Sequence, residues 1–311
     1  MKTGEKKKRK PRLITGKNGE LLVASPKAWL YLLPPLIVFV LFVFYPMLAV
    51  LRTAFYEKYV YIISKGTGFG LASFKYVLND KTFWLACRNT GILILVALPT
   101  TVILSLAIAL MLNSIKRLQG FFQTLFFTPY VTSTVAIGTV FYTLFHSQHG
   151  YINYFLGLFG VDPIAWLTDS SKVIWALCIF CIWNGLAFKI VLFLAGLQKI
   201  DKKVYQAAKI DCAKPGKTLF RITLPLLSPT SLFLFITTFI SSMKVYQSVD
   251  VMTGGGPRQQ TEVMVYYIYR LAFDDNRIDR ASVVALLFFV VLLIVTASTM
   301  RITNKNVHYE A

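Results

Sequence analysis

The sequence predicts an all-α, polytopic membrane protein with six transmembrane helices, and three observations lead to that fold class. The chain of 311 residues is 56% hydrophobic and only 15% charged, far from the composition of soluble domains. Six runs are each long enough to cross a hydrocarbon core about 30 Å thick, which needs about 20 helical residues. The runs are too long and alternate too little to be barrel strands, so helices are expected.

The six predicted spans follow one another along nearly the whole chain. Only the fourth contains a charge, Lys189, whose position two turns from the cytoplasmic end favours a side chain that snorkels to the membrane surface. Prolines inside several runs predict kinks that neighbouring helices or water must satisfy. The spans cover residues 28–51, 91–112, 120–145, 173–197, 224–243 and 281–300.

Basic residues outside the spans are distributed unevenly. Four alternate segments hold 20 Lys and Arg residues, and the other three hold 11. The first set comprises 1–27, 113–119, 198–223 and 301–311, and the second comprises 52–90, 146–171 and 244–280. The positive-inside rule therefore predicts a multi-pass protein of the plasma or inner membrane with both termini in the cytoplasm. A nucleic-acid partner is not expected, because no basic face interleaved with aromatic residues is present.

The chain divides by composition into tails, a first span and a core. Residues 1–27 form a basic cytoplasmic tail that we expect to be disordered ahead of an uncleaved first span. Residues 28–90 contain that span and an external segment, 91–301 the core, and 302–311 a cytoplasmic C-terminal tail. In the external segment, "GTGFG" (66–70) predicts a flexible turn, and the apolar spacing of 71–90 predicts a short interfacial helix.

The predicted cytoplasmic segment 198–223 is longer than a simple helix connection. Its first half predicts a helix with Asp201 as N-cap. Val204, Ala207, Ala208 and Cys212 form a stripe of small residues along it, which suits close packing against another protein. The alternative, a helix lying on lipid, favours larger apolar residues on that face. Pro215-Gly216 ends this helix, a second helix follows, and Pro225 marks the entry into the fifth span.

The triplet Gly216-Lys217-Thr218 matches the end of a phosphate-binding P-loop. The full motif requires another glycine five residues earlier, between a strand and a helix, so that backbone N–H groups converge on the phosphates. Asp211 occupies that position, and the preceding residues have helical rather than strand spacing. No nucleotide site is therefore predicted on this chain.

The stretch "QAAKIDCAKPGKTLFRITLPLLSP" (206–229) resembles the loop of permease subunits of binding-protein-dependent ABC importers. Gln206 stands where the family usually has Glu, and Cys212 where it has Gly. The resemblance implies a coupling loop, 198–223, whose helix docks in a groove of a separate ATPase subunit, and a permease core over 91–301. The implied coupling residues are Val204, Gln206, Ala207, Ala208, Asp211, Cys212, Ala213, Leu224 and Pro225.

Two external stretches, 251–273 and 70–80, are similar to the carbohydrate branch of that family, the maltose and glycerol-phosphate type. The branch implies import of a di- or oligosaccharide, a second non-identical permease subunit, two ATPase subunits that carry ATP and Mg, and an extracytoplasmic sugar-binding protein. No cofactor is expected on this chain. The loop Gly254, Gly255, Gly256 and Pro257 is by composition a flexible turn; the family context favours a loop close to the binding protein or the outer gate.

Polar and aromatic residues in or beside the spans are candidates for sugar contact. Each also fits a helix–helix contact or an interfacial belt. They are Tyr142, Trp183, Asn184, Tyr246 and Gln247. An ion-coupled secondary transporter is the alternative, but it requires paired buried carboxylates, and the six runs contain none. Catalysis and metal binding are not expected either, because His146 and His149 lack a nearby carboxylate or cysteine set.

Overall fold

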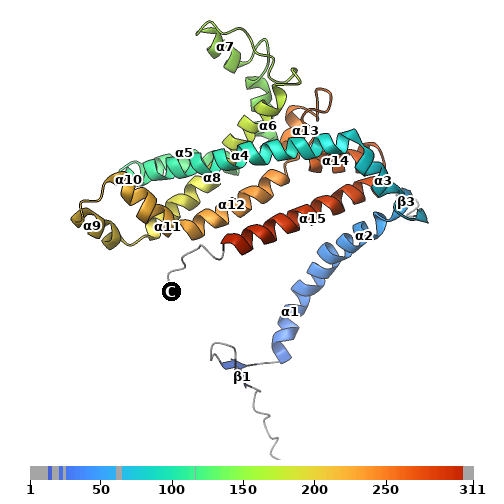
Figure 1. The fold of residues 1–311 in the computed structure, drawn as a ribbon, viewed down its shortest axis with the longest axis horizontal. Helices are drawn as coiled ribbons and strands as arrows, with labels where there is room; N and C mark the ends of the chain where they lie inside the picture. The colour runs from blue at the N-terminus through green and yellow to red at the C-terminus, as the bar shows by residue number, and fades with distance from the viewer. Residues whose placement is uncertain (1–12, 16–20, 24–25, 61–64, 116, 304–311) are drawn as a thin grey trace, which may run out of the picture. The chain divides into compact units, whose positions relative to one another are not determined.

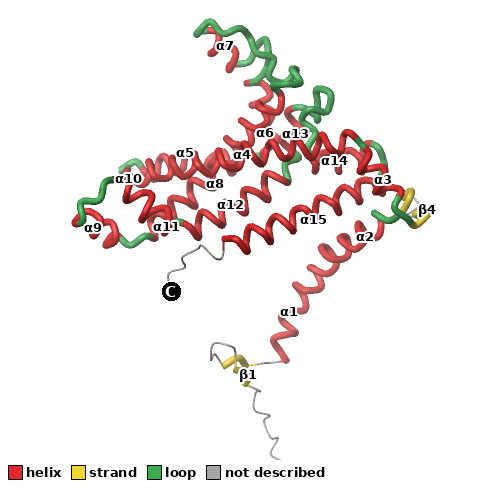
Figure 2. The backbone as a smooth tube through the Cα atoms, in the orientation of Figure 1, coloured by secondary structure: helices red, strands yellow, loops and turns green. Residues whose placement is uncertain are grey.

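The computed structural model describes residues 1–311 except 1–12, 16–20, 24–25, 61–64, 116 and 304–311. The chain divides into two units, Met1–Arg52 and Thr53–Ala311. Helices dominate the described residues, which confirms the all-α fold class (Figure 2). Most of the predicted tails, 1–27 and 302–311, lies outside the described residues.

The first unit contains a small hairpin and one long apolar helix. β1 (Leu13–Thr15) pairs antiparallel with β2 (Leu21–Val23), with Leu13 opposite Val23. Part of the tail therefore forms a strand pair, whereas the sequence analysis expected a disordered tail. The helix consists of α1 (Pro26–Phe39), a π-helical turn (Val40–Phe44) and α2 (Tyr45–Thr53). It coincides with the first predicted span.

Four long helices form the body of the second unit. They are α4 (Lys81–Ser114), α8 (Val173–Lys199), α12 (Ser228–Met243) and α15 (Ile278–Thr303). α12 packs against the other three, and α4 and α8 lie side by side (Figure 1). Buried apolar side chains such as Leu112 of α4, Phe193 of α8 and Leu234 of α12 form a core between them. α4 begins ten residues before the predicted span, because Asp80 caps it by accepting a hydrogen bond from the Thr82 N–H at 2.9 Å.

Two predicted spans are broken. The run 120–145 folds as α5 (Gln119–Val131) and α6 (Thr134–Leu144), which meet at 97° just after Pro129, so the interruption here is much sharper than a proline kink within one helix. The fifth span follows α10 (Pro215–Thr218), a π-helical turn (Leu219–Thr223) and α11 (Leu224–Leu226), with a bend of 68° before α12. Among the described residues, four helices are long and apolar enough to cross a membrane, or six if each bent pair is one span.

The remaining elements are shorter. β3 (Tyr56–Val60) pairs antiparallel with β4 (Lys65–Phe69), and the expectation of a flexible turn at 66–70 is therefore wrong. The ring of Tyr56 occupies the space that a side chain on Gly66 would need, so the glycine permits the pairing. The remaining helices are α3 (Ala72–Asn79), α7 (Tyr151–Gly157), α9 (Lys202–Ile210), α13 (Gln247–Met252) and α14 (Met264–Tyr269), followed by a π-helical turn over Arg270–Asp274.

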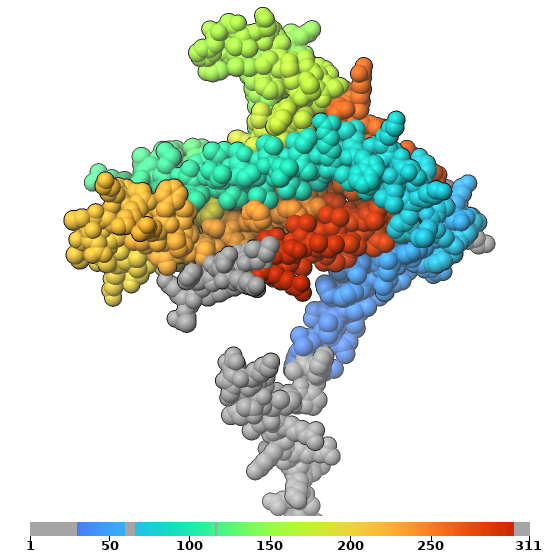
Figure 3. Space-filling model, viewed as in Figure 1, coloured from blue at the N-terminus to red at the C-terminus, as the bar shows by residue number. Residues whose placement is uncertain are grey.

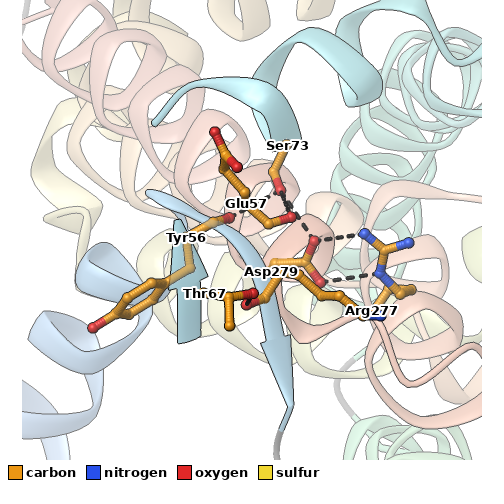
Figure 4. A network of polar contacts seen from close by, with 7 residues as sticks. Tyr56, Glu57, Thr67, Ser73, Arg277 and Asp279 are labelled. Atoms are coloured by element: carbon orange, nitrogen blue, oxygen red, sulfur yellow. Dashed lines mark hydrogen bonds and ion pairs between the residues drawn. The ribbon is translucent and has the colours of Figure 1, made fainter. Parts of the chain in front are cut away.

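A buried carboxylate connects the β3–β4 hairpin, α3 and α15 (Figure 4). Asp279, fully buried in the first turn of α15, has the Ser73 hydroxyl 3.0 Å from its Oδ2. Arg277 forms a two-pronged contact, with Nη2 2.8 Å from Oδ2 and Nε 3.2 Å from Oδ1. The Ser73 hydroxyl is also 3.1 Å from the Tyr56 carbonyl oxygen. Charge-assisted bonds of this kind fix the geometry of this end of the bundle.

Candidate functional site

The helix predicted in segment 198–223 is α9, at the end of the bundle opposite β3 and α3 (Figure 1). Asp201 caps it as predicted, since its Oδ1 accepts a hydrogen bond from the Lys203 N–H at 2.9 Å. The hydroxyls of Tyr205 and of Thr223, the latter in the turn after α10, lie 3.3 Å apart. The segment from α9 to α11 therefore closes on itself and remains exposed at this end (Figure 3).

The predicted stripe of small residues on α9 does not face one direction. Ala208 is buried, with 7% of its surface exposed, whereas Ala207 and Gln206 are exposed and Val204 is half-buried. Ala208 therefore packs within this chain, and Ala207 with Gln206 is left on the surface. Ile210 adds a strongly exposed apolar side chain, 82% accessible, which the sequence reading did not single out.

α9 ends in a hydrogen-bonded turn that places Cys212 in the left-handed region, with φ of 50°. The Ala213 N–H donates to the Ala208 carbonyl at 2.9 Å, and the Cys212 N–H donates to the Lys209 carbonyl at 3.1 Å. This pairing is a Schellman motif, in which the left-handed residue is usually glycine. Asp211 closes the helix through its backbone, whose N–H donates to the Ala207 carbonyl at 3.0 Å.

The segment after this turn contains the residues that resemble a P-loop. Lys217 and Thr218 lie in α10, and the Thr218 N–H donates to the Lys214 carbonyl at 3.0 Å. A helix precedes the triplet where a P-loop requires a strand, so the backbone has no phosphate-cradling loop here. Leu224 and Pro225 lie in α11, ahead of the bend into α12.

A polar cavity of about 290 Å³ lies between α8, α12 and the junction of α5 and α6. Hydroxyl, amide and amine groups line it, and none of its lining residues is acidic. They are Tyr130, Thr132, Thr134, Asn184, Gly185, Phe188, Lys189, Thr237, Thr238 and Ser241. A second hollow of about 110 Å³, also lined by Thr101 of α4, shares five of these residues. The break between α5 and α6 thus brings two threonines to a cavity inside the bundle.

The sequence favoured a Lys189 side chain that snorkels toward the cytoplasmic end of α8, but the side chain points the other way. Only 8% of its surface is exposed, and Nζ donates to the Gly185 carbonyl at 2.8 Å, one turn back along the helix. The side chain is directed back because the cavity provides polar space next to Gly185, where a Cβ would lie 3.2 Å from Nζ. Sequence reasoning noted this charge but did not place it in the candidate path.

The five predicted sugar contacts do not converge on one cavity. Asn184 lines the polar cavity, whereas Tyr142 lines a separate, more open one of about 600 Å³. The ring centroid of Trp183 in α8 lies 4.9 Å from that of Phe141 in α6. Trp183 therefore makes a helix–helix contact, the alternative to sugar binding given in the sequence analysis. Tyr246 lies in a group of aromatic rings, 4.8 Å from Tyr269, and the neighbouring Gln247 is exposed.

The predicted external loop, Gly254 to Pro257, is a hydrogen-bonded turn beside that open cavity. Gly254 and Gly255 have φ of 55° and 79°, and a Cβ on Gly255 would come within 2.8 Å of the Tyr266 ring. The Thr261 hydroxyl donates to the Gly256 carbonyl at 2.8 Å. Only glycine combines this backbone with so close an approach. Among the described residues, no group of His, Cys, Asp or Glu could hold a metal ion.

Residues 101–308 match the family described as binding-protein-dependent transport system inner membrane component. The lactose transport system permease protein LacF of Rhizobium radiobacter is 35% identical over 79% of this chain and 83% of its own length. The multiple sugar-binding transport system permease protein MsmF of Streptococcus mutans is 28% identical over 89% and 95%. A chain of a bacterial ABC transporter that imports alginate has the same fold, with a TM-score of 0.78 at 24% identity over 90% and 95%.

Proposed function

This chain belongs to the family of binding-protein-dependent transport system inner membrane components, and on that premise we propose that it is a permease subunit of an ATP-driven importer of a di- or oligosaccharide. It crosses the membrane six times, with both termini in the cytoplasm. Its partners are a second, non-identical permease subunit, two ATPase subunits that bind ATP and Mg, and an extracytoplasmic sugar-binding protein. The names of its relatives support a sugar as the substrate.

One arrangement carries the mechanism. The exposed α9 lies in the chain between α8 and α12, and both of these helices line the polar cavity. A partner that binds α9 and moves it therefore pulls on both cavity walls. The exposed Ala207 and Gln206 form the part of α9 nearest to the ATPase, and the buried Ala208 together with the contact between Tyr205 and Thr223 transmits the movement.

An ion-coupled transporter is less well supported. Proton relays in transporters are built from Asp, Glu and His side chains in the pathway, and none of these lines either polar hollow in the described part of the chain. The hydroxyls there suit sugar hydroxyl groups. Thr238 and Ser241 donate their own protons to backbone carbonyls of α12, which leaves oxygen lone pairs free to accept hydrogen bonds from a sugar.

The test reconstitutes the complete complex in proteoliposomes and measures uptake of labelled lactose and raffinose. Uptake should require ATP on the side of the membrane where the ATPase subunits lie, and it should persist without an ion gradient. Ala207→Trp should leave the bundle folded but weaken ATPase association, since overpacking a close contact costs about 1–3 kcal/mol, or about 5- to 150-fold. The matched control, Ala207→Ser, should bind and transport as the unmodified complex does. Normal association of Ala207→Trp would remove α9 from the mechanism.

A further inference from the structure

Lys189 is a buried cation without a counterion in the described part of the chain. The three ion pairs found there join other residues, and the single hydrogen bond of Nζ goes to the Gly185 carbonyl. An ammonium group has three N–H donors, so two of them have no protein acceptor. A buried charge is costly unless it is paired, so the folded chain holds a site that an anion would stabilise.

The cavity around Lys189 has the composition of a ligand site. Its volume of about 290 Å³ is at the lower end of the range for ligand pockets. The threonine and serine hydroxyls on α12 are committed as donors to their own helix, and the Thr132 hydroxyl donates to the Thr128 carbonyl. Lys189 is therefore the strongest donor that faces this space, and it carries the only charge among the lining residues.

We propose that Lys189 binds an anionic group of the transported sugar, a carboxylate, phosphate or sulfonate, while the surrounding hydroxyls and Asn184 contact its neutral part. This inference rests on the proposed function, because it assumes that the cavity lies on the transport path. It narrows the substrate class from sugars in general to acidic sugars. The anion would supply the acceptors that the two remaining N–H groups of Lys189 lack.

The first test measures the charge preference of the cavity without a sugar. Ser241→Cys, introduced after Cys87, Cys178, Cys181 and Cys212 are replaced by serine, places a thiol on the cavity wall. The purified complex is treated with anionic sulfonatoethyl or cationic trimethylammonioethyl methanethiosulfonate. The ratio of the two rates reports the local potential, because any change in thiolate fraction affects both reagents equally.

Relative to reaction with a free thiol in solution, the anionic reagent should be favoured. Lys189→Gln should lower the anionic-to-cationic rate ratio about tenfold, as expected for reagents of opposite charge about 6 Å from a cation at the dielectric constant of water. Lys189→Arg should keep the preference. Lys199→Gln, which removes an exposed charge from the same helix, is the matched control and should change nothing. An equal ratio in the Lys189→Gln and unmodified complexes overturns the proposal. If Lys189→Gln does not fold, Lys189→Met, which removes the charge but keeps an unbranched side chain, gives the same test.

The second test compares sugars that differ only in charge. ATP-driven uptake of digalacturonate against digalactose, and of maltose 6′-phosphate against maltose, is measured in proteoliposomes. Uptake of an acidic member, lost about tenfold or more in Lys189→Gln and retained in Lys189→Arg, supports the proposal. Uptake of only neutral sugars, unaffected by Lys189→Gln, overturns it and leaves the proposed function intact. A complex that hydrolyses ATP and transports no sugar refutes the proposed function instead. If phosphatidylglycerol abolishes the charge preference and acidic sugars do not, the anion is a lipid headgroup and the proposal fails.

Discussion

Replacing Cys212 by glycine should stabilise the end of α9. Cys212 has φ of 50°, a conformation that costs a residue with a Cβ about 1–2 kcal/mol. Glycine avoids that cost but loses more backbone entropy on folding, about 0.5–1 kcal/mol. The net gain expected for Cys212→Gly is therefore about 1 kcal/mol or slightly less.

Hydrogen exchange can measure this gain locally. The amides of Cys212 and Ala213 donate to the carbonyls of Lys209 and Ala208 at 3.1 and 2.9 Å, and they exchange only when the turn opens. A gain of about 1 kcal/mol slows their exchange about fivefold. The Thr218 amide, bonded to the Lys214 carbonyl in α10, serves as an internal reference and should not change.

Two further substitutions separate backbone strain from the chemistry of the thiol. Cys212→Ala keeps the Cβ and should leave the exchange rates unchanged, whereas Cys212→Val adds a β-branched side chain at positive φ and should accelerate exchange. If exchange in Cys212→Gly is equal to or faster than in the unmodified chain, the left-handed turn does not limit the stability of α9. If the prediction holds, ATPase binding should tighten by at most the same fivefold, because docking requires a folded α9.

Three other predictions concern topology, nucleotide and pH. In a cysteine-free background, Leu158→Cys and Asp274→Cys should react with an impermeant maleimide from outside the cell, and Lys217→Cys should not; the reverse pattern would invert the topology. Lys217→Ala should leave the nucleotide affinity of the assembled complex unchanged, and photolabelling of this chain by azido-ATP that the variant abolishes would contradict the absence of a P-loop. Burial raises the pKa of Glu262, 1% exposed, from 4.5 to about 7, although Arg270 at 2.9 Å opposes the shift. The stability contributed by this raised pKa is present below about pH 4.5 and is lost as the pH rises through about 7, so Glu262→Gln should flatten the fall in Tm between these values; an unchanged slope would mean that Glu262 does not titrate there.

Long helices were predictable from the sequence because the signal that defines them is local. A run with at most one charge that is about as long as the bilayer is thick has few alternatives, and α8 and α15 match the predicted spans within three residues at each end. The N-cap at Asp201 was equally predictable, since a short acidic side chain before a helical pattern binds the first free N–H groups. These features depend on residues next to one another in the chain.

Features that depend on contacts between distant segments were missed. The break at Thr132 and Ser133 lies in an uncharged run of the sequence, and only Pro129 and the Thr-Ser-Thr sequence around the break indicate it. Asp279 lies within segment 244–280, which the sequence places outside the predicted spans, but its burial depends on Ser73, more than 200 residues earlier in the chain. The predicted orientation of the Lys189 side chain was wrong because a lysine two turns from a helix end can either snorkel to the membrane surface or point into a polar cavity. Only the packing of α12 and of the α5–α6 junction decides between these orientations.

The broken helix and the polar cavity explain each other. Thr132 and Ser133 have extended backbone conformations, so the amide groups at the start of α6 lack carbonyl partners in the preceding turn. Non-helical backbone at membrane depth is tolerated only where it faces protein or a solvated space rather than lipid. Thr132 and Thr134 line the cavity that contains Lys189, and this cavity provides such surroundings. The run 120–145 holds 26 uncharged residues and bends by 97° at a polar cavity. On the proposed function, we interpret it as one membrane span that opens near its midpoint to form part of the proposed ligand site.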